Sequence, residues 1–186
     1  MRSNVIYSRN QRASRIQNIL WVRIGVASTL MLLIAGSSRS HASGSASANL
    51  SVNASVANNC TISTSPLAFG AYDPVVANAS TNLDATGTVT VACTKGATAT
   101  IGLGLGSNAS GSTRRMTDGS SNFLTYEVYQ DSSRSALWGN SGAELLSPSA
   151  APSKSTRDFT VYGRVPSNQD VPAGSYTDTV TATVNF

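Results

Sequence analysis

The chain has 186 residues, of which 12% are charged, and a formal net charge of +4. Much of the positive charge lies in the first 42 residues, and the rest of the chain is slightly acidic with scattered basic residues. This distribution excludes the basic surface that nucleic-acid binding requires. The abundance of Ser, Thr, Gly, Ala and Asn predicts an all-β domain with many turns.

The first 42 residues are typical of a secretory signal peptide. A basic stretch ends at Arg23, an apolar run follows from Ile24 to Gly36, and Ser40-His41-Ala42 fits the small-x-small cleavage rule. The alternative is an uncleaved membrane anchor, but the run is short for a helix that must span a bilayer with about 20 residues. We therefore predict export and removal of residues 1–42.

An alternating segment follows. Residues 48–56 place apolar side chains on one face and Asn or Ser on the other, which predicts a half-buried strand. The apolar face comprises Ala48, Leu50, Val52, Ala54 and Val56. Two interpretations stay open: the segment is the first strand of its own domain, or part of it is donated to another molecule. The boundary between donated and retained residues is not determined by the pattern.

Two cysteines follow the predicted signal, Cys60 and Cys93. An even pair in an exported chain favours one disulfide, which would stabilise the fold by about 3–4 kcal/mol. Two buried free thiols are the alternative. No histidine follows His41, so we expect no metal site.

The middle of the chain reads as short strands separated by turn-rich loops, which indicates a sandwich. The loop at 107–122 carries Arg114-Arg115, which we expect to be solvated, and Trp138 is expected to anchor the core or a loop. The expected elements are a bent or edge strand at 66–74, a loop at 75–86, strands at 88–93, 98–105, 123–130 and 157–165, and irregular structure at 131–155.

The last segment has the clearest strand pattern. From Tyr176 onward the even positions are mainly apolar and the odd positions are mainly threonine. The apolar face includes Val180, Ala182, Val184 and Phe186. These residues are expected to pack in the core and to border a groove.

We expect no catalytic activity and no cofactor. Without a histidine after residue 42, the exported chain cannot form a Ser-His-Asp or Cys-His site. Glu127 and Glu144 could be imagined as a glycosidase pair, but two carboxylates alone do not indicate one.

Several motifs, in order, resemble one known family. They are Pro66-Leu67-Ala68-Phe69-Gly70-Ala71-Tyr72-Asp73-Pro74, Arg115-Met116, the Leu124–Asp131 segment, Trp138-Gly139, Val161-Tyr162-Gly163-Arg164-Val165-Pro166 and the Val171–Val180 segment. The chain over residues 48–186 is similar to the spore coat protein U domain, a family that includes pilins of archaic chaperone–usher pili. The stretch 140–158 departs from the usual pattern, which leaves its loop contacts open.

The resemblance implies an incomplete immunoglobulin-like Greek-key β-sandwich that lacks its last strand and is completed by a donor strand. Its implied partners are a periplasmic chaperone, an outer-membrane usher and identical or related pilin subunits in a head-to-tail polymer. The implied organisation is a signal peptide at 1–42, a donor strand or start of the first strand at 43–58, and the pilin domain at 59–186.

The implied function is that of a surface pilus subunit in adhesion or biofilm formation. The alternatives are a spore or cyst coat protein of the same fold and a monomeric carbohydrate-binding sandwich. A tip adhesin is disfavoured, because the chain has space for one domain only.

Overall fold

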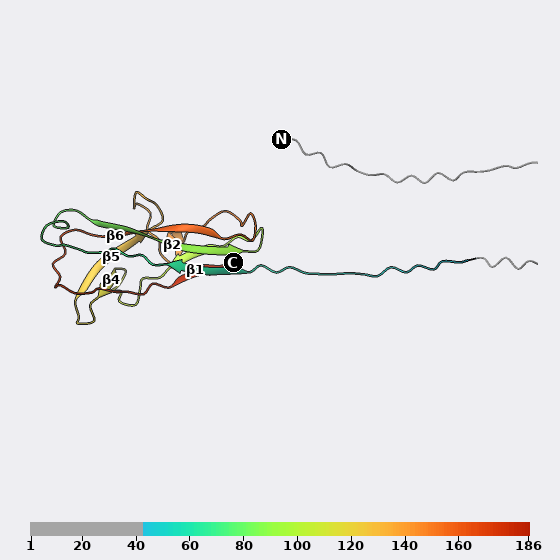
Figure 1. Ribbon diagram of the computed structural model, residues 1–186, viewed down its shortest axis with the longest axis horizontal. Helices are drawn as coiled ribbons and strands as arrows, with labels where there is room; N and C mark the ends of the chain where they lie inside the picture. The colour runs from blue at the N-terminus through green and yellow to red at the C-terminus, as the bar shows by residue number, and fades with distance from the viewer. Residues whose placement is uncertain (1–42) are drawn as a thin grey trace, which may run out of the picture. The chain divides into compact units, whose positions relative to one another are not determined.

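Two antiparallel sheets form the domain in the computed structural model, which describes residues 43–186 (Figure 1). The predicted signal peptide at 1–42 lies outside these residues. The strands are β1 (Cys60–Ser65), β2 (Leu83–Cys93), β3 (Thr100–Leu103), β4 (Arg114–Thr117), β5 (Phe123–Tyr129), β6 (Arg157–Val165) and β7 (Ala182–Asn185). A single 3-10 turn, Gly142–Glu144, is the only helical element within the described residues.

The larger sheet has the order β1-β2-β6-β5-β4, and the smaller sheet pairs β3 with β7. The long ladder between β2 and β6 runs from Leu83 opposite Val165 to Val91 opposite Arg157. Because side chains alternate across a strand, Val89, Val91 and Val165 point into the core while the threonines between them face outward.

Trp138 lies at the centre of this core with no exposed surface. Its indole Nε1 donates a 2.9 Å hydrogen bond to the carbonyl of Ile101 on β3, so its polar atom is satisfied. The expectation that Trp138 anchors the core is confirmed. The other buried apolar residues come from both sheets, including Ile101, Leu124, Val128 and Val161.

Two loop predictions were partly wrong. Residues 83–86, expected in a loop, form the first part of β2, and the expected loop at 107–122 contains β4. β4 pairs with β5, with Arg114 opposite Tyr126 and Thr117 opposite Phe123. A four-residue polar strand has no distinctive local pattern, because its pairing partner rather than its own periodicity stabilises it.

Three predicted strands are shorter or absent, including the one expected at 98–105, where β3 spans Thr100–Leu103 only. Residues 66–74 form no strand, and in the last segment β7 spans Ala182–Asn185 only. The residues before β7 still continue its course, because Thr177 pairs with Thr117 and the Gly104 amide donates to the Thr181 carbonyl at 2.9 Å.

The alternating segment at 48–56 was expected to be a half-buried strand, and this was wrong for the isolated chain. Residues 43–59 form no regular element, and all of them are exposed. Within residues 43–186, nothing covers the apolar face of this segment.

Candidate functional site

An apolar groove of about 390 Å³ lies between β1 and β7. Both strands border it, through Thr64 and Ser65 at the end of β1 and through Val180 and Ala182 at and before β7. Its apolar lining includes Pro66, Leu67, Phe69, Val89, Leu103, Met116, Val128, Val161, Val180 and Ala182. A groove lined mainly by apolar side chains suits an extended peptide whose alternate side chains point into it.

Both strands that border the groove have a free edge. β1 is the outer strand of the larger sheet, and β7 pairs only with β3 within residues 43–186. The two strands lie next to each other, but no ladder of hydrogen bonds joins them. Unpaired backbone edges beside an apolar groove are unfavourable in water.

The floor of the groove depends on two glycines on the inner face of the larger sheet. Leu67 lies over Gly87 and Gly163, and a Cβ built at Gly163 would stand 2.7 Å from Leu67 Cδ2 and 2.8 Å from Phe69 Cζ. The missing side chains therefore allow the segment after β1 to cross the sheet closely. The sequence motif Pro66–Pro74 thus forms part of the groove rather than a strand of its own.

A second hollow of about 630 Å³ lies along the same crossing segment, with Tyr72, Val171 and Tyr176 among its lining residues. The Tyr72 hydroxyl donates to the Pro166 carbonyl at 3.0 Å and accepts from the Gln169 amide at 2.9 Å, which ties this lining residue to the connection after β6. Leu67, Phe69, Met116 and Tyr176 line both hollows, so the two are neighbouring parts of one furrow.

One carboxylate lies in the groove wall, at Asp178. The Tyr126 hydroxyl donates to Asp178 Oδ2 at 2.7 Å, and the Ser107 and Asn108 amides donate to Oδ1 at 2.9 and 3.2 Å. Gly106, with φ of 91°, lets the loop approach, because a Cβ there would collide with the carboxylate. Burial, and then the bond to Asp178, raise the pKa of Tyr126 above its ordinary value.

The same chain carries an exposed apolar segment ahead of β1. Leu50, Val52 and Val56 are 87%, 83% and 85% exposed, and Ala48 and Ala54 are also exposed. In these described residues the predicted donor face is therefore unoccupied, and its alternation of apolar and polar side chains matches the period of a β-strand.

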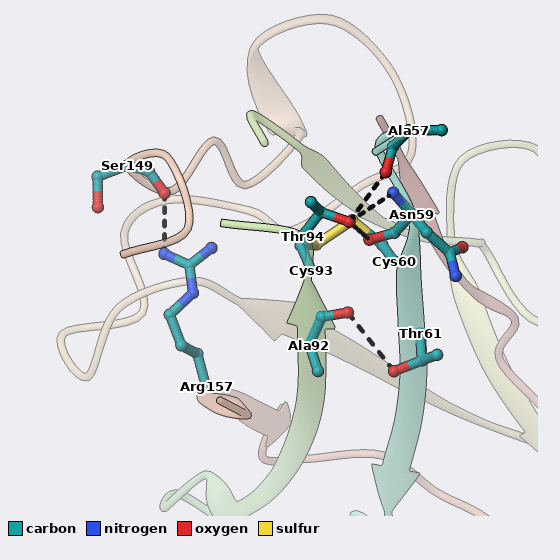
Figure 2. The surroundings of a disulfide bond; sticks show 9 residues. All are labelled: Ala57, Asn59, Cys60, Thr61, Ala92, Cys93, Thr94, Ser149 and Arg157. Carbon is teal, nitrogen blue, oxygen red and sulfur yellow. Dashed lines mark hydrogen bonds between the residues drawn. A yellow bond between two sulfur atoms is a disulfide. The ribbon is translucent and has the colours of Figure 1, made fainter. Parts of the chain in front are cut away.

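A disulfide lies where this segment joins the domain. Cys60 and Cys93 are bonded, with the two sulfurs 2.03 Å apart, and they face each other across the β1–β2 ladder. Figure 2 shows Thr94 beside them, with its side chain directed at Ala57 and Asn59. The root of the exposed segment is therefore held to the sheet at this end of β1.

A family model described as the Spore Coat Protein U domain matches residues 46–183. The chain belongs to this family. Protein U of Myxococcus xanthus is 40% identical over 162 residues, which cover 76% of this chain and 85% of that protein. The motif-based resemblance is thereby confirmed.

A solved structure supports the fold of this spore coat protein U domain. The crystal structure of the CsuC–CsuE chaperone–tip adhesion subunit pre-assembly complex, from archaic chaperone–usher Csu pili of Acinetobacter baumannii, contains a similar chain. The TM-score is 0.53 at 22% identity, over 70% of this chain and 40% of that one, so this chain spans less than half of its length. The predicted immunoglobulin-like all-β class is confirmed.

The four predicted groove residues of this spore coat protein U domain separate into two groups. Val180 and Ala182 line the groove, whereas Val184 stands opposite Ile101 in the smaller sheet and Phe186 is 55% exposed. Asp178 was not among the predicted site residues. Its signal was visible, because it is a carboxylate on the otherwise apolar face of the last segment.

Arg114 was expected in a solvated loop, and this was wrong. The side chain is 2% exposed, and Nη1 contacts Glu127 Oε2 at 3.1 Å. The same guanidinium donates to the carbonyls of Leu103, Gly104 and Trp138 at 3.0, 3.0 and 2.8 Å. Burial raises the pKa of Glu127 although Arg114 opposes this shift. Arg114 therefore stabilises β4 and the core, and Glu127 serves as its partner.

Residues 43–186 contain no cluster of His, Cys, Asp and Glu side chains that could hold a metal ion. Among these same residues, no helix is long and apolar enough to cross a membrane.

Proposed function

We propose that this chain is a structural subunit of an extracellular chaperone–usher pilus and that it polymerises by donor-strand exchange. One observation carries this proposal: a single chain has both an apolar groove between two unpaired edges and an exposed segment with strand periodicity. The exposed groove and the exposed apolar segment are each unfavourable in water. The segment of one chain is suited to cover the groove of another.

The energetics support such a contact. Burial of Leu50, Val52 and Val56 contributes about 1.5–3 kcal/mol for each side chain. An added strand also supplies main-chain hydrogen bonds to the free edges of β1 and β7. Its alternate side chains insert into pockets in the groove, which makes the contact specific. Part of this gain is offset by the cost of ordering the segment.

The placement of the two features favours a filament. The donor segment precedes β1, while the groove lies between β1 and β7, so the contact joins two different surfaces. A heterologous contact of this kind repeats head to tail and produces an open polymer instead of a closed dimer. The donor residues in this proposal are Ala48, Leu50, Val52, Ala54 and Val56.

The open groove also explains the need for partners. Before polymerisation, a periplasmic chaperone would cover the groove with a strand of its own, and an outer-membrane usher would exchange it for the next subunit's segment. The Csu pre-assembly complex is a chaperone–subunit complex, which supports this assignment by analogy of fold. The chain would then act at the cell surface in adhesion or biofilm formation, without catalysis or cofactor.

A coat function is the second candidate. The 40% identity to Protein U of Myxococcus xanthus and the name of the family favour it. The same groove and donor segment would link subunits in a coat. Electron microscopy of the producing cells separates the two candidates, since pili are thin filaments and a coat is a continuous layer.

Co-expression of the exported chain with its candidate chaperone tests the proposal. Removal of residues 43–52 should leave a subunit that binds chaperone but forms no fibres, as seen by gel filtration and electron microscopy. A matched variant keeps the length of the segment and replaces Leu50, Val52 and Val56 by Ser. Normal fibres from both variants would contradict the assignment of the donor.

A further inference from the structure

We propose that the Thr94 hydroxyl directs the N-terminal segment away from the groove of its own domain, so that the segment reaches a second copy of the chain. This inference rests on the proposed donor-strand function and adds a positioning residue to it. The competing event is self-closure, in which the segment folds back into its own groove and produces a monomer that cannot polymerise.

The side-chain hydrogen bonds of Thr94 that the described residues show all go to the root of the segment, Ala57 and Asn59. Thr94 Oγ1 accepts a hydrogen bond from the Asn59 amide at 3.1 Å and donates to the Ala57 carbonyl at 3.2 Å, with the Asn59 carbonyl 3.4 Å away (Figure 2). The Thr94 amide donates to the Asn59 carbonyl at 2.8 Å. One residue therefore holds backbone groups of both Ala57 and Asn59.

These contacts extend the β1–β2 ladder beyond its last pair, Cys60 and Cys93. Main-chain pairing cannot continue further, because β2 ends and the chain turns at Gly96, which has φ of 85°. Beyond the end of β2, the Thr94 side chain takes over the pairing with the neighbouring segment. It binds the backbone of residues 57–59 in place of a continued β2 strand. The segment therefore leaves the domain in line with β1.

The turn that carries Thr94 is itself well held. The Ala97 amide donates to the Thr94 carbonyl at 3.0 Å, and the Gly96 amide donates to the Ala151 carbonyl at 2.8 Å. Ala97 and Ala151 are buried, with 2% and 3% of their surface exposed. Together with the adjacent disulfide, these contacts give the hydroxyl a fixed position from which to orient residues 57–59.

Self-closure would require a reversal at these same residues. Only Ala57, Asn58 and Asn59 separate Val56 from β1, and a three-residue loop is long enough for a hairpin along the free edge of β1. Asparagines favour such turns because they tolerate left-handed backbone conformations. A tethered segment has an effective concentration in the millimolar range, so self-closure would outcompete a neighbouring subunit unless it were opposed.

The observed backbone is not that of a reversal. Among the described residues, the non-glycine positions with positive φ are Ser121, Arg134 and Asn168. Neither Asn58 nor Asn59 therefore adopts the left-handed conformation that a tight hairpin would use. The sequence of this root would permit a turn, and the contacts with Thr94 hold it extended.

Three variants of the exported chain test this role. Thr94→Val removes the hydroxyl but keeps the branched shape and the backbone amide that binds Asn59. Thr94→Ser keeps the hydroxyl. Thr61→Val is the matched control, because its hydroxyl lies near the same disulfide and contacts only the Ala92 carbonyl at 3.5 Å.

Each chain is refolded from denaturant with its disulfide intact, and gel filtration separates monomers from polymers. Protection of residues 43–56 from protease then identifies closed monomers. We expect Thr94→Val to increase the ratio of closed monomer to polymer about fivefold, the factor that corresponds to one ordinary hydrogen bond. Thr94→Ser and Thr61→Val should match the parent chain. An unchanged ratio in a folded Thr94→Val protein would overturn the inference.

Hydrogen exchange in the parent chain, in complex with its chaperone, gives a second measurement that does not depend on the folding of any variant. The Asn59 amide should exchange at least about fivefold more slowly than the Val56 amide, because Thr94 accepts its hydrogen bond. Equal rates would contradict the inference. Normal fibres after removal of residues 43–52 would instead refute the donor function itself, so the two failures are distinguishable.

Discussion

The Tyr126 hydroxyl lies 2.7 Å from Asp178 Oδ2, and this contact joins β5 of the larger sheet to the segment that leads into β7. Both residues line the groove, so the bond fixes the distance between two of its walls. The loop at 106–108 holds the other carboxylate oxygen. Polar contacts therefore join two walls of the groove in the single chain.

Tyr126→Phe should lower the free energy of unfolding by about 1 kcal/mol, the typical contribution of one hydrogen bond. The stability that Tyr126 contributes also depends on pH, and the direction of this dependence is defined. Since burial raises the folded-state pKa of Tyr126, the unfolded chain ionises this phenol first, and stability falls as the pH rises above the ordinary value of 10.0. Urea denaturation of the subunit closed by a peptide of residues 43–58, measured at pH 8 to 11 in the parent chain and the variant, checks both expectations. A pH slope in the variant that equals that of the parent would contradict the role of Tyr126.

Arg114→Met should destabilise the domain by about 3–5 kcal/mol, because it leaves Glu127 and three core carbonyls without their donor. Thermal unfolding gives the measurement. Arg115→Met is the matched control: Arg115 stacks on Phe123 at 4.0 Å near the surface, and its loss should cost less than about 1 kcal/mol. An equal loss of stability in the two variants would show that the buried Arg114–Glu127 pair contributes no more to stability than the surface contact of Arg115.

Glu127→Gln tests the same pair through pH. Burial raises the folded-state pKa of Glu127 above 4.5, so its contribution to stability is complete below pH 4.5 and is lost as the pH rises through the folded-state pKa. The glutamine variant should lack this component of the pH profile. Denaturation curves between pH 3 and 7 measure this pH dependence of stability. An identical profile in the parent chain and the variant would contradict the role of Glu127.

Gly163→Ala should weaken the binding of a peptide of residues 43–58 to the groove, because the new methyl group would displace Leu67 and Phe69. We expect a loss of about 1–3 kcal/mol in binding free energy, measured by calorimetry on a subunit without its own donor segment. Gly104→Ala is the control, since a Cβ there would meet the Thr181 carbonyl at an ordinary 3.5 Å. Unchanged affinity in Gly163→Ala would show that the crossing segment does not shape the groove.

The faces of the donor segment should differ in their effects on polymer stability. Leu50→Ser and Val52→Ser should each weaken the link by about 1.5–3 kcal/mol, because each side chain would lose its pocket. Ser51→Ala, on the opposite face, should change it by less than about 0.5 kcal/mol. The temperature at which purified fibres dissociate ranks the variants. Equal effects on both faces would argue against insertion as a strand.

Local patterns in the sequence determined the position of β6, the partners of the disulfide and the apolar face of the N-terminal segment. The alternation in residues 157–165 and the cysteine pair gave β6 and the partners of the disulfide, because side-chain periodicity and oxidising export act through nearby residues. Leu50, Val52 and Val56 also stood out as one face. That they remain exposed in the single chain could not be read from this pattern, because alternation does not reveal which molecule supplies the partner.

Only the tertiary structure decided which residues meet. Arg114 became a core residue because β4 pairs with β5 beside Trp138, and Asp178 became a groove residue because the loop at 106–108 folds onto it. Thr94 came to hold the root of the exposed N-terminal segment through a contact that spans 35 positions of the chain. Such contacts depend on backbone groups brought together by the fold, and backbone groups carry no sequence signature of their own.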